Sequence, residues 1–263
     1  MSILFNKIVS SALNISEKQV ENTIRLLDEG ATIPFISRYR KEVTGALDEV
    51  QIGNIKEQYD KLRELEKRKQ TIITTIDEQG KLTPDLRTRL ENSWDAMEIE
   101  DIYLPYKPKR RTRAEVAREK GLEPLAKILM IQTENNLDIR AQAFVKNDVA
   151  DTEEALKGAR DIIAEWISEN ERARNMVRSI FRKGAIISSH VVKGKEEEAA
   201  KYRDYFDWSE PLRRCSSHRL LAVRRGESEG FLKVSIEPDS ELCIERLEGL
   251  FVKNATASAA QVN

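Results

Sequence analysis

The 263-residue sequence predicts a mainly α-helical protein, a multihelical array with a little β structure near its C-terminal end. Charged residues make up 34% of the chain and apolar residues 40%, a balance typical of helices that each keep one solvated face. Aromatic residues amount to 6%, and 11 glycines and 7 prolines are too few for a fold built from tight hairpins. Apolar residues also recur every three or four positions over much of the chain, which is the period of an amphipathic helix.

Start and stop signals predict three helices in the first 45 residues. Apolar residues at helical spacing predict the first of them: Ile3, Leu4, Ile8, Val9 and Leu13. Ser16 followed by Gln19 has the form of a capping box and predicts the start of the second, which Gly30 ends. Pro34 favours the first turn of a third, short helix, and we expect Tyr39 to pack on the apolar face of that helix.

A long helix is predicted over residues 48–79, where there is no proline and a single glycine. Its apolar residues follow a three-four rhythm: Ile52, Ile55, Tyr59, Leu62, Ile73 and Ile76. Glu66 and Lys69 interrupt this rhythm, which indicates a helix packed at its two ends rather than a long symmetric coiled coil. Thr83 before Pro84 then has the form of a new helix start, because the hydroxyl caps the helix and proline needs no hydrogen-bond partner there.

The middle of the chain contains one expected extended segment and several helices. Residues 104–108 should be extended, because each proline disfavours the α conformation of the residue before it. Thr112 with Glu115 forms a second capping box. Ser168 with Glu171 suggests the start of another helix. Three further helices are expected, over 123–132, 137–147 and 152–169.

Toward the C-terminal end the pattern becomes mixed. Residues 185–192 are apolar and β-branched enough for a short strand or a buried extended segment, and 195–206 should return to helix. Residues 216–225 fit a helical turn or a strand, and the two possibilities stay open. Gly230 and Pro238 favour a short strand between them, after which Asp239 opens a final helix.

We expect two parts, a multihelical domain over 1–207 and a connecting segment over 208–263. The last residues, 255–263, are small and polar and show neither a cap nor a stop signal. A natural C-terminus can have this form, and so can a cut within a longer protein. We interpret the segment as truncated.

The composition excludes several classes of protein. No apolar run approaches the ~20 residues that a membrane-spanning helix needs, and no signal peptide is recognisable, so we expect a cytoplasmic protein without a membrane partner. Two cysteines and two histidines lack the spacing of a metal site, and His190 should be a core residue. No phosphate-binding glycine loop or nucleophile motif is present. We therefore expect no enzymatic activity, no metal and no cofactor.

The basic segment, residues 103–113, is the most distinctive local feature of a chain whose net charge is −1. It contains two tyrosines and five cations but no acid: Tyr103, Tyr106, Lys107, Lys109, Arg110, Arg111 and Arg113. Lysine and arginine bind phosphates with release of counterions, and tyrosine rings stack on unpaired bases. The alternative is a solvated loop whose cations pair with nearby acids such as Glu98, Glu100 and Asp101.

A second cluster of cations lies within residues 172–183. Arg174, Arg178 and Arg182 are spaced by four residues, so they share one face of a helix that could follow a phosphate backbone. The cluster could equally pair with the acidic stretch 196–198, and we favour that internal or solvated interpretation. In a third cluster, residues 38–41, we expect Tyr39 to serve packing rather than stacking.

Several blocks of the sequence, in the same order, resemble the Tex family of bacterial transcription accessory proteins. The blocks that carry the resemblance are 30–42 (GATIPFISRYRKE), 44–49 (TGALDE), 80–83 (GKLT), 100–114 (EDIYLPYKPKRRTRA), 121–126 (GLEPLA), 204–206 (DYF), 209–212 (SEPL), 217–219 (SHR) and 225–227 (RGE). The resemblance implies a multihelical N-terminal region with a helix-turn-helix-like subdomain. It also implies later domains, with a nuclease-like fold, helix-hairpin-helix elements and an OB-fold RNA-binding domain, that this sequence does not contain.

Two hypotheses about function follow. In the first, the chain contributes weak contacts to RNA or DNA through the basic segment and the arginines of 172–183, and braces the later domains. In the second, the helical array is a protein-interaction scaffold for transcription machinery and makes no direct contact with nucleic acid.

Overall fold

The computed structural model describes residues 2–146 and 148–262, and its contacts divide the chain into two compact units, Met1–Lys107 and Pro108–Asn263. Both units are mainly helical, and a small antiparallel sheet lies near the C-terminal end, so the predicted fold class is confirmed. No helix in the described ranges is both long and apolar enough to span a membrane.

The first unit is organised along one long helix, α5. Its elements are α1 (Ser2–Leu13), α2 (Glu17–Asp28), α3 (Ile33–Tyr39), α4 (Lys41–Thr44), α5 (Glu49–Glu78), α6 (Pro84–Asn92), α7 (Ala96–Tyr103) and the 3-10 turn η1 (Leu104–Tyr106). The predicted caps explain where two of the helices begin. Ser16 and Gln19 form the expected reciprocal capping box at the start of α2, and the Thr83 side chain accepts a hydrogen bond from Leu86 N–H at the start of α6.

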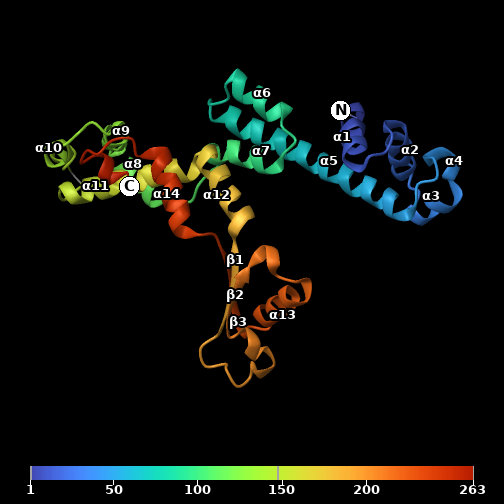
Figure 1. Cartoon of the computed structure of the whole chain (residues 1–263). Helices are drawn as coiled ribbons and strands as arrows, with labels where there is room; N and C mark the ends of the chain where they lie inside the picture. Colours follow the sequence, from blue (N-terminus) through green and yellow to red (C-terminus); the bar gives the residue numbers. More distant parts are fainter. Residues whose placement is uncertain (1, 147, 263) are drawn as a thin grey trace. The chain divides into compact units, whose positions relative to one another are not determined.

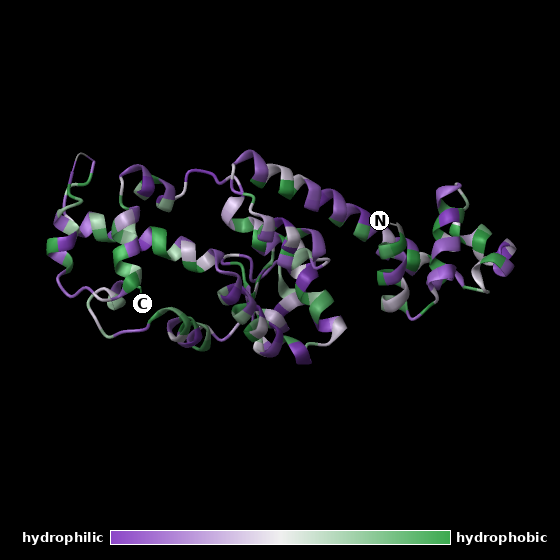
Figure 2. Cartoon of the chain, turned by 90° about the horizontal axis from the view of Figure 1, so that it is seen from above, coloured by the Kyte–Doolittle hydropathy of each residue, from purple (hydrophilic) through white to green (hydrophobic). Residues whose placement is uncertain are grey.

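Two separate apolar cores lie along α5, as the interrupted rhythm predicts. The first half of α5 packs with α1, α2 and α3 around Val9, Ile36 and Ile52. The second half packs with α6 and α7 around Ile76 and Leu90. Figure 2 shows that α5 is largely hydrophilic between these two parts.

The second unit contains helices α8 to α14 and the sheet. Its elements are α8 (Arg113–Glu119), α9 (Glu123–Ile131), α10 (Leu137–Gln142), α11 (Thr152–Glu169), α12 (Glu171–Gly184), β1 (Ile186–Val191), η2 (Ala200–Tyr205), β2 (Asp207–Pro211), η3 (Leu212–Arg214), α13 (Ser217–Ser228), β3 (Leu232–Glu237), α14 (Ser240–Phe251) and η4 (Ala259–Gln261). Its core lies where α11 packs against α8 and α9, around Leu122, Leu129 and Ile162.

The sheet has the strand order β2-β1-β3, with both pairings antiparallel, and α13 lies against one side of it (Figure 1). Ile187 and Ser189 of β1 are buried on the covered side, together with Leu232 of β3. The boundary expected at 207/208 falls at the first residue of β2, which pairs with β1. Residues on both sides of that boundary therefore share one sheet.

The C-terminal segment after α14 returns to the α9–α11 core. Gln132 is buried and lies at the centre of this contact, where its Nε2 donates to the Phe251 carbonyl (2.7 Å) and its Oε1 accepts from Lys253 N–H (2.7 Å). Its own carbonyl accepts from Asn254 Nδ2 and Thr256 Oγ1, both at 2.9 Å. Residues 252–262 are thus packed against the unit, although their composition resembles that of a loose end.

Several predicted boundaries were wrong. Leu104–Tyr106 is a 3-10 turn that continues α7 rather than an extended segment, because Lys107 N–H donates to the Leu104 carbonyl (3.4 Å) as well as to the Tyr103 carbonyl (3.0 Å). The helix expected over 137–147 ends at Gln142, although residue 147 itself lies outside the described residues. The cap of α12 is Asn170 rather than Ser168, whose hydroxyl donates to the Glu165 carbonyl within α11.

The segment 195–206 is a series of turns followed by a 3-10 helix, not the α-helix expected. Bonds to β1 hold its end, since Val191 N–H donates to the Phe206 carbonyl (2.9 Å) and Ser189 Oγ to the Tyr205 carbonyl (2.6 Å). The ambiguous stretch 216–225 is helical and belongs to α13.

Candidate nucleic-acid interface

The basic segment crosses the boundary between the two units, so its residues are described in two groups. Tyr103 belongs to the first unit, where its side chain is 6% exposed in the core of α5, α6 and α7. The Arg68 guanidinium lies 5.2 Å from its ring centroid. The ring is therefore almost fully buried, and the stacking role predicted for Tyr103 does not fit this structure.

Tyr106 and Lys107 close the first unit. The Tyr106 ring is half-buried against the same core, and its carbonyl accepts a hydrogen bond from Gln79 Nε2 at 2.7 Å. Lys107 is exposed near Glu100. The pKa of Glu100 is lowered chiefly by its hydrogen bond from Arg68 (2.6 Å), with a smaller electrostatic contribution from Lys107. Lys107 is thus a solvent-facing cation beside a paired acid.

Lys109 begins the second group and is neutralised by α11. Its ammonium pairs with Glu165 at 3.2 Å and with Glu169, and Arg118 of α8 pairs with the same Glu165. Burial, the largest influence, raises the pKa of Glu165, but hydrogen bonds from Arg118 and Lys109 outweigh it, so the net pKa is lowered. Lys109 therefore ties the segment to α11 instead of facing a ligand.

The three arginines of the segment face solvent. Arg110 is exposed and makes no ion pair or side-chain hydrogen bond with any described residue. Arg111 pairs with Glu119 at 2.9 Å, and both side chains are more than half exposed. Arg113 is 85% exposed and lies 3.7 Å from Asp161 of α11. Exposed pairs of this kind contribute little and can exchange for a phosphate, so these cations remain available.

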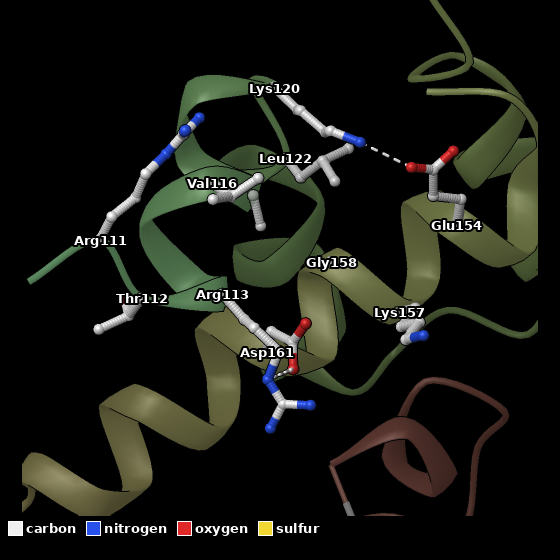
Figure 3. Close-up of a pocket in the computed structure, with 11 residues that line it drawn as sticks. Arg111, Thr112, Arg113, Val116, Lys120, Leu122, Glu154, Lys157, Gly158 and Asp161 are labelled. Atoms are coloured by element: carbon white, nitrogen blue, oxygen red, sulfur yellow. Dashed lines mark hydrogen bonds and ion pairs between the residues drawn. The ribbon is translucent and has the colours of Figure 1, made fainter. Parts of the chain in front are cut away.

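Arg111 and Arg113 border a hollow of about 480 Å³ between α8 and α11, which we call the α8–α11 hollow (Figure 3). Val116, Leu122 and Gly158 belong to its apolar lining, and four cations and two acids complete the charged part: Arg111, Arg113, Lys120, Lys157, Glu154 and Asp161. Figure 3 shows Lys120 linked to Glu154 and Arg113 linked to Asp161, with Lys157 drawn between the two acids along α11. The lining thus has a net positive charge.

Lys157 and Lys120 were missed by the sequence analysis. Both lie outside the basic segment. Lys120 is the C-cap residue of α8, and Lys157 lies within the amphipathic pattern of α11, so only the packing of α11 against α8 brings Lys157 to Arg111 and Arg113. Gly158 permits this close approach. A Cβ atom at that position would lie 2.4 Å from Leu122 Cδ1 and 3.3 Å from Ala117 Cβ. A glycine inside a strong helical pattern was the available signal.

Arg174 and Arg178 of α12 border a different hollow, the α12 groove, of about 510 Å³ between α11, α12 and α14. Arg174 donates to the Ser168 carbonyl (3.3 Å), and Arg178 to Asn175 Oδ1 (3.0 Å). Arg182 is exposed, and its carbonyl accepts from Arg213 Nε at 2.9 Å. The groove lining is mostly apolar and shares no residue with the α8–α11 hollow. Arg174 and Arg178 therefore line a different site in the second unit from Arg111 and Arg113, and Arg182 lines neither.

His190 was expected in the core, and that prediction was wrong. Its side chain is 62% exposed, and its Nδ1 lies 3.3 Å from Asp207 Oδ1 on the neighbouring strand. The alternation of β1 explains this placement, because Ile187 and Ser189 take the covered side and His190 the other. Among the described residues there is no group of three or more histidines, cysteines and acids placed to hold a metal ion.

Comparison with known proteins gives matches over most of the chain. The model of the Tex-like protein N-terminal domain matches residues 4–77, and the model described as Tex central region-like matches residues 132–261. The chain is 47% identical over 243 residues to Protein YhgF of Escherichia coli (strain K12), an alignment covering 92% of this chain and 31% of YhgF.

Two further relatives carry more informative names. The chain is 44% identical over 235 residues to the Transcriptional accessory protein Tex of Neisseria gonorrhoeae, covering 89% of this chain and 31% of that protein. It is 28% identical over 240 residues to the human S1 RNA-binding domain-containing protein 1, covering 88% of this chain and 24% of that protein.

Proposed function

Because this chain belongs to the Tex family and spans about a third of the length of the curated bacterial relatives reported above, we propose that it is a non-catalytic N-terminal module that contacts RNA or DNA. The contact is made to the phosphate backbone, by Arg110, Arg111 and Arg113 with Lys157. In the longer protein, the same helical array braces the domains that follow.

One observation carries this proposal: the exposed arginines Arg111 and Arg113 line the α8–α11 hollow together with Lys157, in a molecule whose net charge is −1. The exposed Arg110 directly precedes them in the chain. Such a chain offers no general attraction to a polyanion, so any affinity has to come from a local group of cations. Three or four cations release few counterions, so we expect weak binding with a measurable dependence on salt.

The test is the salt dependence of binding. Affinity of the full chain for labelled single-stranded RNA and DNA is measured by fluorescence anisotropy over a series of salt concentrations. Replacing Arg110, Arg111 and Arg113 with alanine should reduce the slope of log affinity against log salt by about 2, at roughly 0.7 per lost phosphate contact. Lys157→Ala should reduce it by less than one further unit.

A matched control removes the same charge elsewhere. Lys56, Lys61 and Lys127 lie on other helices in exposed i,i+4 pairs with acids, so their triple alanine variant also lowers the net charge by three. It should leave the slope near that of the unaltered chain. If the two triple variants gave equal slopes, only the total charge would matter and the proposed contact would be wrong.

The proposal that the module is non-catalytic has its own support. Burial raises the pKa of the Cys215 thiol and of the Cys243 thiol, which disfavours the thiolate that a nucleophilic cysteine needs. We expect the chain to cleave neither RNA nor DNA with or without magnesium. Magnesium-dependent cleavage that persists in repeatedly purified protein would overturn this proposal.

The α12 groove favours a second candidate function, a protein-interaction scaffold for transcription machinery. Val177, Phe181 and Leu247 are among its apolar lining, and Phe181 is 37% exposed. Apolar grooves with an arginine rim suit a protein partner better than a phosphate backbone. A Phe181→Glu variant should lose partners captured from nuclease-treated bacterial lysate. Identical capture by the variant and the unaltered chain would rule the groove out.

A further inference from the structure

Helix α3 of the first unit carries two large aromatic rings on its solvent side. Phe35 is 40% exposed and Tyr39 is 64% exposed. Their ring centroids lie 5.4 Å apart with the planes inclined at 44°, so the two rings form a continuous surface, which we call the aromatic pair. Tyr39 was expected to pack in the core, and its exposure makes that prediction wrong.

The opposite side of α3 explains why the aromatic pair faces outward. Ile36 is fully buried in the first core, and Ser37 is buried with its hydroxyl oxygen within hydrogen-bond distance of the Pro34 carbonyl (3.1 Å) and of Glu49 Oε1 (3.3 Å). Residues four apart share a helix face, so anchoring Ile36 and Ser37 turns Phe35 and Tyr39 together toward solvent. The rings are therefore held on a rigid element, and no large conformational cost attends the binding of a flat ligand.

Cations adjoin the aromatic pair. The Arg40 guanidinium lies 5.2 Å from the Phe35 ring centroid, and Arg38 and Lys41, its near neighbours in the sequence, are exposed. The acids near this group are Glu42, which is exposed, and Glu49, which pairs with Arg38 at 3.8 Å with both side chains more than half exposed. Such a loose pair costs little to separate. Three cations against two acids leave the surface slightly positive.

We propose that the aromatic pair is a stacking platform for unpaired bases of single-stranded nucleic acid, with Arg38, Arg40 and Lys41 placed to meet the adjoining phosphates. Flat aromatic faces beside cations are what single-stranded chains use, because each base offers a π-face and each linkage a negative charge. Bases within a duplex have no free face, so the platform selects single strands. This inference rests on the proposed function for its class of ligand, but it concerns another unit and another physical interaction.

The test separates stacking from charge. The full chain is titrated with a single-stranded RNA carrying the fluorescent base 2-aminopurine, and with the same sequence as a duplex. Tyr39→Ala should weaken single-strand binding by roughly tenfold and abolish the quenching that stacking causes, while the salt slope stays unchanged because no charge is removed. Tyr39→Phe should retain both affinity and quenching. Duplex binding should be the same for all three proteins.

Two controls separate loss of stacking from a general effect of the substitution on the protein. Ile3→Ala removes a side chain that is 78% exposed in the same unit and should bind like the unaltered chain. Tyr39 is mostly exposed, so its alanine variant should keep the melting temperature and helical circular dichroism of the unaltered chain. Single-strand binding by Tyr39→Ala equal to that of the unaltered chain would overturn the platform, as would equal losses in Tyr39→Phe and Tyr39→Ala. If only the stacking platform is wrong, the triple arginine variant will still show its reduced salt slope. If only the proposed function is wrong, that reduction will be absent while the Tyr39 variants behave as expected.

Discussion

Lys69 carries a positive charge into the interior of the first unit, where it is 2% exposed. Its ammonium donates to the carbonyls of Glu91 (2.8 Å) and Ser93 (3.2 Å), lies 3.6 Å from the Trp94 ring centroid and pairs with Glu66 at 3.5 Å. Burial lowers the pKa of Lys69, and the Glu66 carboxylate partly offsets this effect. The lysine that interrupts the apolar rhythm of α5 thus joins α5 to the end of α6.

Replacing Lys69 with methionine should lower the free energy of unfolding by about 3 kcal/mol, because it removes the donor to two carbonyls and the cation that pairs with the Glu66 carboxylate. Urea unfolding followed by circular dichroism measures this change. Lys67→Met is the matched control, since Lys67 is exposed on the same helix and should change stability by less than about 0.5 kcal/mol. Equal stabilities for the two variants would contradict a structural role for Lys69.

Glu165 makes the stability of the second unit depend on pH. Its carboxylate accepts from Lys109, Arg118 and Thr112, and its folded-state pKa lies below the ordinary 4.5. A carboxyl with a lowered pKa stabilises the fold above its unfolded pKa, and the contribution is lost as pH falls through the folded pKa. Glu165→Gln should therefore cost about 2 kcal/mol at neutral pH, and the stabilities of the variant and the unaltered chain should converge as the pH falls through the lowered folded-state pKa of Glu165.

Urea unfolding at several pH values checks this convergence. A difference that persisted undiminished to the lowest pH would assign the loss to packing rather than to charge.

The candidate sites show which residue roles a sequence can reveal. The exposure of Arg110, Arg111 and Arg113 follows from a polar segment next to prolines, and the cluster was found. The neutralisation of Lys109 could not be found, because its partners Glu165 and Glu169 lie more than fifty positions away and meet it only when α11 packs beside the segment. Tyr103 was expected to be exposed and is buried, whereas Tyr39 was expected to be buried and is exposed. Each lies in a short helix, and the packing of neighbouring helices decides which face of such a helix is buried.

At the level of elements, the helices with local caps were predicted closely, because a cap acts within three residues of its helix start. The starts of α2, α6 and α14 at Ser16, Thr83 and Asp239 are examples. Strand β2 was not predicted, and 195–206 was assigned to the wrong structure. Both segments are held by hydrogen bonds to β1. Because β1 lies elsewhere in the chain, the residues of these segments alone do not reveal their structure.

The close packing of α8, α9 and α11 depends on Gly158, and this gives a prediction for the elements. Gly158→Ala should destabilise the second unit by about 1–3 kcal/mol, because the new methyl group would overlap Leu122, which is fully buried and cannot move aside. Gly249→Ala in α14 meets no atom within 4 Å and should stabilise by about 0.5–1 kcal/mol. Thermal unfolding of both variants checks the contrast. Equal changes in melting temperature would show that a methyl group at position 158 does not clash with Leu122.

At the level of the whole molecule, each unit has apolar cores of its own. The two cores along α5 are made by residues before 107, and the core around α11 by residues after 113, including Val262 from the C-terminal segment. The sheet and α13 also lie entirely within the second unit. A domain folds alone when its core is complete, so the packing favours division at Lys107/Pro108.

Fragments of the chain test this division against the boundary expected from the sequence. Residues 1–107 and 108–263 should each unfold cooperatively, and their circular dichroism spectra should sum to that of the full chain. Residues 208–263 should not fold alone, because they lack β1, the central strand, and the α9–α11 surface on which residues 252–262 pack. Cooperative melting of 208–263 would favour the 207/208 boundary instead. Non-cooperative melting of 108–263 would mean that its core requires residues of the first unit. We expect cooperative melting instead, because every residue of that core lies after position 113.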